Sequence, residues 1–139
     1  MALTPNQIGL IRQSFEALRK NPKRHSVEFY EAFFAREPEA RGMFRSDLEG
    51  QGMRFMSTLS VILDHLDRED GMGARLAELG QAHRAMGVRA AQFEPMGQAL
   101  VETLEAAMGD AFTPAMRAAW DAAFIEIAAK LIDKGGIAE

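Results

Sequence analysis

The residues that start and stop helices constrain the fold of this chain more than any other feature. Thr4 offers an N-cap, Pro5 suits the first helical position, and Gln7 stands where a capping-box partner is expected. Apolar residues then recur at helical spacing until Asn21-Pro22 stops the run: Ile8, Ile11, Phe15 and Leu18. The opening residues therefore predict an amphipathic helix with a defined start and stop.

Similar start and stop signals divide the rest of the chain into helices. A second segment begins near Arg24, carries an aromatic stripe and turns near Pro38 and Gly42; the stripe is Val27, Tyr30, Phe33 and Phe34. Residues 45–52 are predicted as a polar, glycine-rich loop, and residues 67–73 as an exposed turn. The further predicted helices are 53–66, 74–86 ending at Gly87, 94–108 broken at Gly109-Asp110, and one capped by Thr113-Pro114 that frays into 133–139.

About six helices without a strand signal or a repeat predict one all-α domain over residues 1–139. Trp120 falls on the apolar face of the last helix, where we expect it in the core. Net charge is −4 with scattered basic residues, which disfavours nucleic acid as a partner. No apolar run approaches the roughly 20 residues of a membrane span, and the start has no leader pattern. We therefore expect a cytoplasmic protein.

One histidine stands out in the segment LGQAHRAMGV, residues 79–88. His83 shares a helix face with Leu76 and Leu79, and the Leu79 carbonyl lies one turn earlier. That carbonyl can accept the proton of one ring nitrogen and leave the other nitrogen free, an arrangement common among metal-ligating histidines. The alternative is a core histidine whose hydrogen bond to the same carbonyl is its only role.

The chain lacks the co-ligands that a bare metal site would need. Cysteine is absent, which excludes thiolate sites and covalent CxxCH haem attachment, and neither His25 nor His65 forms a ligand pair with His83. We expect both of these histidines at solvated positions. A single imidazole suits a metal whose other ligands come from a macrocycle, as in haem. Nine methionines and nine phenylalanines suit the walls of a flat apolar slot, although they suit a helical core equally well.

At this point the chain resembles a globin nearly from end to end. Three blocks carry the resemblance: LIRQSFEALRKNPKRHSVEFYEAFFAREPEARGMF, LAELGQAHRAMGV and GDAFTPAMRAAWDAAF. The first is similar to neuroglobin-like chains, and the second has the family's H-x-x-x-G-V. The resemblance implies a globin fold of about six to eight helices around non-covalent haem b, in a bacterial single-domain protein. It makes His83 the proximal iron ligand, Phe44 a wedge against the haem, and Val88 and Phe93 part of the proximal wall.

On the distal side, the resemblance places Gln51 where neuroglobin has a histidine, with Tyr30 facing the same site. A tyrosine paired with glutamine resembles the pocket of bacterial flavohaemoglobins. Arg54 and Thr58 are the alternatives for the distal position if the alignment shifts by one turn. Phe34 and Phe55 are predicted cofactor contacts, and Arg54 either reaches a haem propionate or is a plain surface residue.

Three functions remain open at this stage. The first is reversible binding of dioxygen, carbon monoxide or nitric oxide for storage, transport or sensing. The second is nitric oxide dioxygenation with a separate reductase, because the chain shows no GxGxxG loop. Phe93 counts against full turnover, since it stands where flavohaemoglobins place a tyrosine whose hydroxyl is able to orient the imidazole. The third is a haem-free interaction domain in which His83 is structural. Without a distal histidine, we expect no internal six-coordination of the neuroglobin kind. The oligomeric state is not predicted.

Overall fold

A computed structural model, described for residues 3–44, 48–66 and 73–138, folds into α-helices joined by short connections. Its α-helices are α1 (Pro5–Arg19), α2 (Pro22–Arg36), α3 (Leu48–Asp64), α4 (Gly73–Ala85), α5 (Phe93–Met108) and α6 (Pro114–Gly135). Three short 3-10 helices lie between them: η1 (Pro38–Met43), η2 (Ala90–Gln92) and η3 (Gly109–Ala111). No strand occurs in these described ranges, and the predicted all-α class is confirmed.

The predicted helix starts rest on side-chain caps. The Gln7 amide N–H donates to Thr4 Oγ1 over 3.1 Å, and Thr4 N–H donates to Gln7 Oε1 over 3.0 Å. Asn21 does more than stop α1, because its side chain accepts a hydrogen bond from Arg24 N–H and caps α2. As a result α2 begins at Pro22, slightly before the predicted start near Arg24.

The predicted loop over residues 45–52 was too long. The part of it that the structure describes, residues 48–52, is already the start of α3. Two glycines in this stretch suggested a loop because glycine disfavours a free helix. In the structure Gly52 is buried where α3 crosses α2, so tertiary packing outweighs the local preference.

The chain after α6 does not fray as predicted. Gly136 adopts the left-handed conformation (φ 62°) that ends the helix, and Ile137 then buries its side chain. The Ala90 N–H donates to the carbonyl of Ala138 over 2.8 Å. The predicted turn over residues 67–73 lies outside the described residues except for Gly73.

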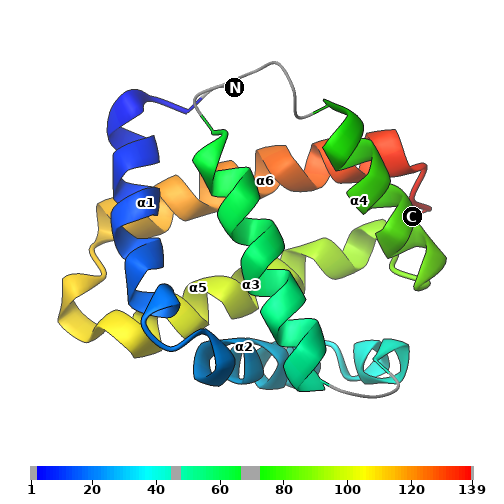
Figure 1. The fold of residues 1–139 in the computed structure, drawn as a ribbon, viewed down its shortest axis with the longest axis horizontal. Coiled ribbons are helices and arrows are strands. Elements are labelled where there is room, and N and C mark those ends of the chain that lie inside the picture. Colours follow the sequence, from blue (N-terminus) through cyan, green and yellow to red (C-terminus); the bar gives the residue numbers. More distant parts are fainter. Residues whose placement is uncertain (1–2, 45–47, 67–72, 139) are drawn as a thin grey trace.

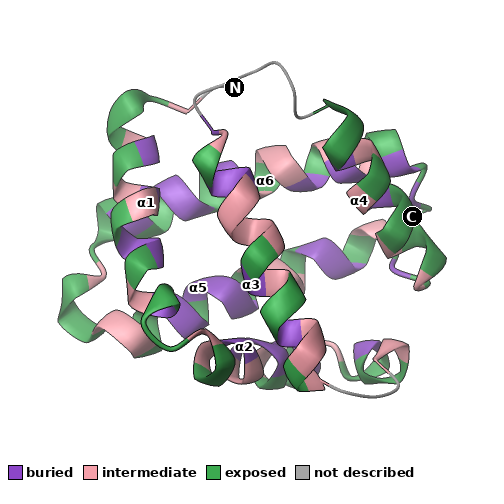
Figure 2. Cartoon of the chain, in the orientation of Figure 1, coloured by how far each residue is buried: buried purple, intermediate pink, exposed green. Residues whose placement is uncertain are grey.

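The helices form an arrangement in which α3 and α4 lie in front of α5 and α6 (Figure 1). Buried residues face the space between the helices, and the outer faces of α1 and α4 are largely exposed (Figure 2). Trp120 is 2% exposed, as predicted for the core, and its Nε1–H donates to the buried Ser14 hydroxyl over 2.6 Å. Within the described residues, no helix combines the length and apolar character that crossing a membrane requires.

Two hydrophobic clusters divide this interior. The larger one includes Trp120 and joins α1, α2, α3, α5 and α6. The smaller one joins Leu76 of α4 to α5, α6 and Ile137. Met96, Phe124 and Ile127 pack against both clusters, so the two are connected through α5 and α6. Helix α4 therefore packs through the smaller cluster, separately from the helices that meet only in the larger one.

Candidate functional site

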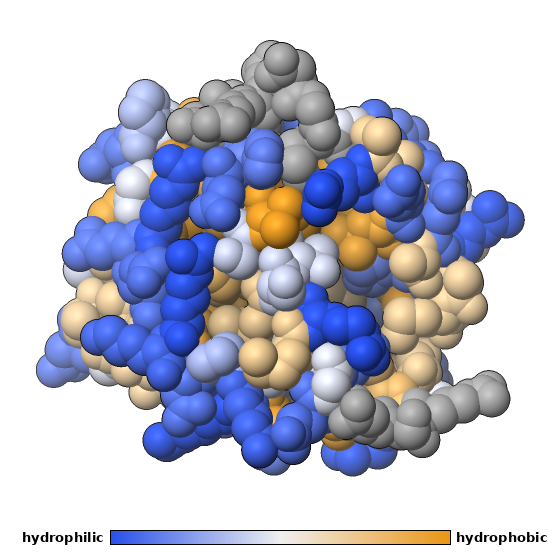
Figure 3. Space-filling view, viewed as in Figure 1, coloured by the Kyte–Doolittle hydropathy of each residue, from blue (hydrophilic) through white to orange (hydrophobic). Residues whose placement is uncertain are grey.

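A cavity of about 230 Å³ separates α3 from α4 and reaches down to α5 and α6. Apolar side chains from five α-helices make most of its wall, and apolar surface is visible between the charged faces of α3 and α4 (Figure 3). The polar side chains on the wall are few: Tyr30, Gln51, Arg54, Thr58 and His83. Such a pocket suits a flat apolar ligand held by a small number of polar contacts.

His83 lies on α4 and lines this cavity, half-buried. Its Nδ1–H donates to the Leu79 carbonyl over 2.8 Å, which is the hydrogen bond expected from the sequence. With the proton on Nδ1, Nε2 keeps its lone pair and is able to bind a metal. The hydrogen bond also fixes the ring to the backbone of α4.

Among the described residues that line the cavity, His83 is the only His, Cys, Asp or Glu. In the described parts of the chain, no group of three or more His, Cys, Asp or Glu residues could hold a metal ion. Neither His25 nor His65 lines the cavity. Each is half-buried, whereas we predicted solvated positions for both. His25 Nδ1 pairs with Glu28 over 2.7 Å, and His65 Nδ1 with the Val61 carbonyl over 2.9 Å. One imidazole in an apolar slot fits a metal that brings its own equatorial ligands.

The wall beside His83 is apolar. The Phe93 ring lies 5.7 Å from the imidazole, centroid to centroid, with 32° between the planes. Val88 is buried in the same cluster, and its N–H donates to the His83 carbonyl over 3.1 Å. Phe93 and Val88 thus both line the cavity beside His83.

The wall on the α2–α3 side carries the hydrogen-bonding groups. Tyr30 of α2 is 4% exposed, and Gln51 and Arg54 come from successive turns of α3. Burial raises the pKa of Tyr30 to about 12, while hydrogen bonding with Gln51 and the Arg54 charge act to lower this pKa. The phenol is therefore neutral at physiological pH and available as a donor.

Arg54 interacts with Gln51 directly. Its Nη2–H donates to Gln51 Oε1 over 3.0 Å, so the amide oxygen has a hydrogen-bond partner at the edge of the cavity. Arg54 is itself exposed while still lining the cavity, as expected for a cation at the pocket edge. The structure thus brings Tyr30, Gln51 and Arg54 together, and it places Thr58 one turn further along the same wall.

Close packing of α3 against α2 brings the side chains of Tyr30 and Gln51 together. A Cβ built on Gly52 would lie 2.3 Å from Ser26 Oγ, which means that α3 and α2 cross in contact at this point. Gln51 precedes Gly52 on α3, and Tyr30 lies one turn after Ser26 on α2. The crossing therefore sets the separation of the two hydrogen-bonding side chains.

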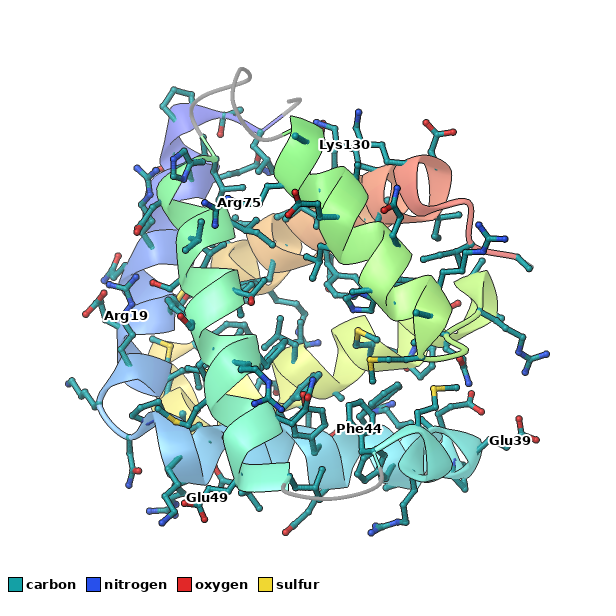
Figure 4. All side chains as sticks on the ribbon, turned by 45° about the vertical axis from the view of Figure 1, so that its right-hand side comes forward. Arg19, Glu39, Phe44, Glu49, Arg75 and Lys130 are labelled. Atoms are coloured by element: carbon teal, nitrogen blue, oxygen red, sulfur yellow. The ribbon has the colours of Figure 1, made fainter. Side chains whose placement is uncertain are left out.

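Aromatic rings fill the space around Tyr30. The Phe55 ring stacks on the Phe29 ring with 4.4 Å between the centroids and 3° between the planes. The Phe44 and Tyr30 ring centroids are 5.0 Å apart. Phe44 is labelled at the lower end of the space between α3 and α4 (Figure 4). Phe34, predicted as a cofactor contact, is buried against Tyr30 and Phe44 and is not part of the cavity wall. It supports those two rings from behind.

Several wall residues were not singled out from the sequence. They share helical spacing with residues that were: Met86 after His83, and Met96 and Leu100 after Phe93. Extending the helix face of His83 by one turn and that of Phe93 by two turns would have identified all three. Met43 of η1 has no such periodic signal, because it lies in an irregular turn.

Comparison with known proteins gives consistent matches. The family model for globins matches residues 27–131. The chain is 29% identical over 141 residues to a leghemoglobin of Psophocarpus tetragonolobus, covering 92% of this chain and 94% of that protein. It is 26% identical over 133 residues to a flavohemoprotein of Deinococcus radiodurans, covering 94% of this chain. The chain spans only 33% of the flavohemoprotein's length.

Proposed function

This chain belongs to the globin family, and from that premise we propose that it holds haem b non-covalently in the α3–α4 cavity and reversibly binds dioxygen. Carbon monoxide and nitric oxide are expected to compete for the same position. The observation that carries the proposal is the His83 imidazole, with Nδ1 bonded to Leu79 and Nε2 free, in the same apolar cavity as Tyr30 and Gln51.

The residues present fit the prosthetic group. His83 would supply the protein's ligand to the iron, Phe44, Phe55, Val88 and Phe93 would contact the macrocycle, and Arg54 would offset propionate charge at the edge. When bound, haem would supply an iron able to bind a diatomic gas reversibly. The low dielectric constant of the apolar wall strengthens each polar interaction made there.

Tyr30 and Gln51 then select among diatomic gases. The neutral Tyr30 hydroxyl and the Gln51 amide N–H₂ are donors for a ligand that carries partial negative charge. Dioxygen gains more from such donors than the less polar carbon monoxide. Arg54 holds the Gln51 oxygen. The amide N–H₂ has two N–H donors, so it is able to donate one to Tyr30 and the other to a ligand in the cavity. The pair therefore favours retention of dioxygen.

A second candidate function is nitric oxide dioxygenation. The juxtaposition of Tyr30 with Gln51 and the match to a flavohemoprotein favour it. Nitric oxide, dioxygen and one electron would give nitrate, and the electron would come from a separate reductase. Nitrate formation that continues over many cycles only when a reductase is added would support this candidate.

Matched histidine variants test the haem proposal. His83→Ala should abolish stoichiometric haem binding, measured by Soret absorbance of the purified protein, and imidazole should restore part of it. His65→Ala is the control, since His65 also bonds through Nδ1 to a carbonyl one turn earlier but lies off the cavity. Equal haem content in the two variants would contradict the ligand assignment and favour another ligand. A wild-type protein without Soret absorbance would instead favour the haem-free interaction domain.

A further inference from the structure

Helix α4 carries His83 but has little buried surface of its own. Only Leu76 and Gly80 are buried among its residues, so Leu76 is the one large side chain of α4 that is fully buried. In Figure 1 the C-terminal end of α6 lies alongside α4. The contact between these two helices is what places the His83 helix.

This contact is made by backbone atoms of two glycines. A Cβ built on Gly80 would lie 2.5 Å from the Leu131 carbonyl oxygen and 2.9 Å from Gly135 Cα. A Cβ built on Gly135 would lie 2.4 Å from the carbonyl carbon of Gly80. Neither position has a flexible side chain that could move aside, so any larger residue must separate the helices.

The segment after α6 reinforces the same contact. Ile137 is buried in one cluster with Leu76 and Val88, which lie before and after His83. The Ala138 carbonyl accepts the hydrogen bond from Ala90 N–H, in the connection that follows α4. The two ends of the α4 region are thereby tied to the C-terminal end of α6.

We propose that the Gly80–Gly135 contact, here called the glycine seat, sets the position of the His83 imidazole relative to the haem. Gly80 lies three residues before His83, and the Leu79 hydrogen bond couples the ring to the α4 backbone. A displacement of α4 at the seat therefore moves Nε2 against the walls formed by α3 and α5. Gly80 and Gly135 are positioning residues, and the inference rests on the proposed ligation of haem by His83.

The iron–histidine stretching band of the ferrous, gas-free protein reads out this position directly. Resonance Raman spectra of Gly80→Ala and Gly135→Ala should show the band shifted from its wild-type position, because a methyl group forces α4 away from α6. Gly52→Ala is the control: its Cβ overpacks an equally tight crossing, against Ser26 on the other side of the cavity. That variant should lose stability without shifting the band.

A third variant covers the case in which overpacking prevents folding. Ile137→Ala removes support for α4 without inserting an atom, and it should shift or broaden the same band. A band at the wild-type position in the folded glycine variants, or in Ile137→Ala if neither glycine variant folds, overturns the proposal. A wild-type protein that binds haem but shows no iron–histidine band would instead contradict His83 ligation, so the two failures are distinguishable.

Discussion

At the residue scale, the proposed binding of dioxygen depends on two hydrogen-bond donors, Tyr30 and Gln51. Tyr30 is buried on α2 and Gln51 lines the same cavity from α3, with its oxygen held by Arg54. The resemblance to globins paired these residues, and the structure places them on one wall. The His83–Leu79 hydrogen bond was predictable from local spacing alone, whereas the Arg54–Gln51 bond depends on rotamers that no sequence pattern specifies.

Removing either donor should speed the release of dioxygen. One hydrogen bond is worth about 1 kcal/mol net, so Tyr30→Phe and Gln51→Leu should each raise the dioxygen dissociation rate roughly fivefold. Stopped-flow replacement of dioxygen measures this rate, and carbon monoxide dissociation serves as the less polar comparison. Dioxygen rates unchanged in both variants would show that the donors are misassigned.

The Tyr30 hydroxyl should titrate far above the ordinary range. Burial raises the pKa of Tyr30 from 10 to about 12, and it is the only tyrosine in the chain. The near-ultraviolet phenolate absorbance, with Tyr30→Phe as the blank, should therefore give a single midpoint near 12 in the folded protein. A midpoint near 10 with the helical circular dichroism intact would contradict the burial of the phenol.

The same pKa shift predicts how stability changes with pH. Between pH 10 and about 12 the unfolded chain has already lost the phenol proton that the folded chain retains. The unfolded state then binds fewer protons, so the free energy of unfolding falls as pH rises through this window. Tyr30→Phe should lack this part of the decline in urea titrations.

At the element scale, the ends of the helices were more predictable than their packing. Thr4, Asn21 and Thr113 bond to backbone N–H groups close in sequence, so the chain itself specifies these starts. The start of α3 was not predicted because Gly52 is needed for close contact with Ser26, which lies on another helix. The end of α6 was missed for the same reason, since Ile137 is buried by residues distant in sequence.

The α2–α3 crossing should be intolerant of a methyl group. Gly52→Ala should lower the free energy of unfolding by about 1–3 kcal/mol, as overpacking does, and adding Ser26→Gly should recover much of the loss. Gly9→Ala is the matched control, because Gly9 is an exposed helical glycine with nothing within 4 Å of the added Cβ. Urea denaturation measures all of these, and equal stabilities of Gly52→Ala and Gly9→Ala would contradict the crossing.

At the scale of the whole molecule, the fold unites three helices that local patterns leave separate. Tyr30 on α2, Gln51 on α3 and His83 on α4 reach one cavity only because α3 crosses α2 and α4 rests on α6. Periodicity predicted an all-α domain, and only the resemblance to globins supplied the order of packing. Neither periodicity nor the resemblance predicted that a residue in an irregular turn, Met43, lines the cavity.

This arrangement predicts one imidazole ligand on the iron and an open position beside Tyr30 and Gln51. No other histidine lines the cavity, since His25 and His65 are engaged elsewhere. The optical and resonance Raman spectra of the reduced, gas-free protein test this most directly. We expect a five-coordinate, high-spin ferrous haem with an iron–histidine band that disappears in His83→Ala. A six-coordinate, low-spin bis-histidine spectrum would contradict it.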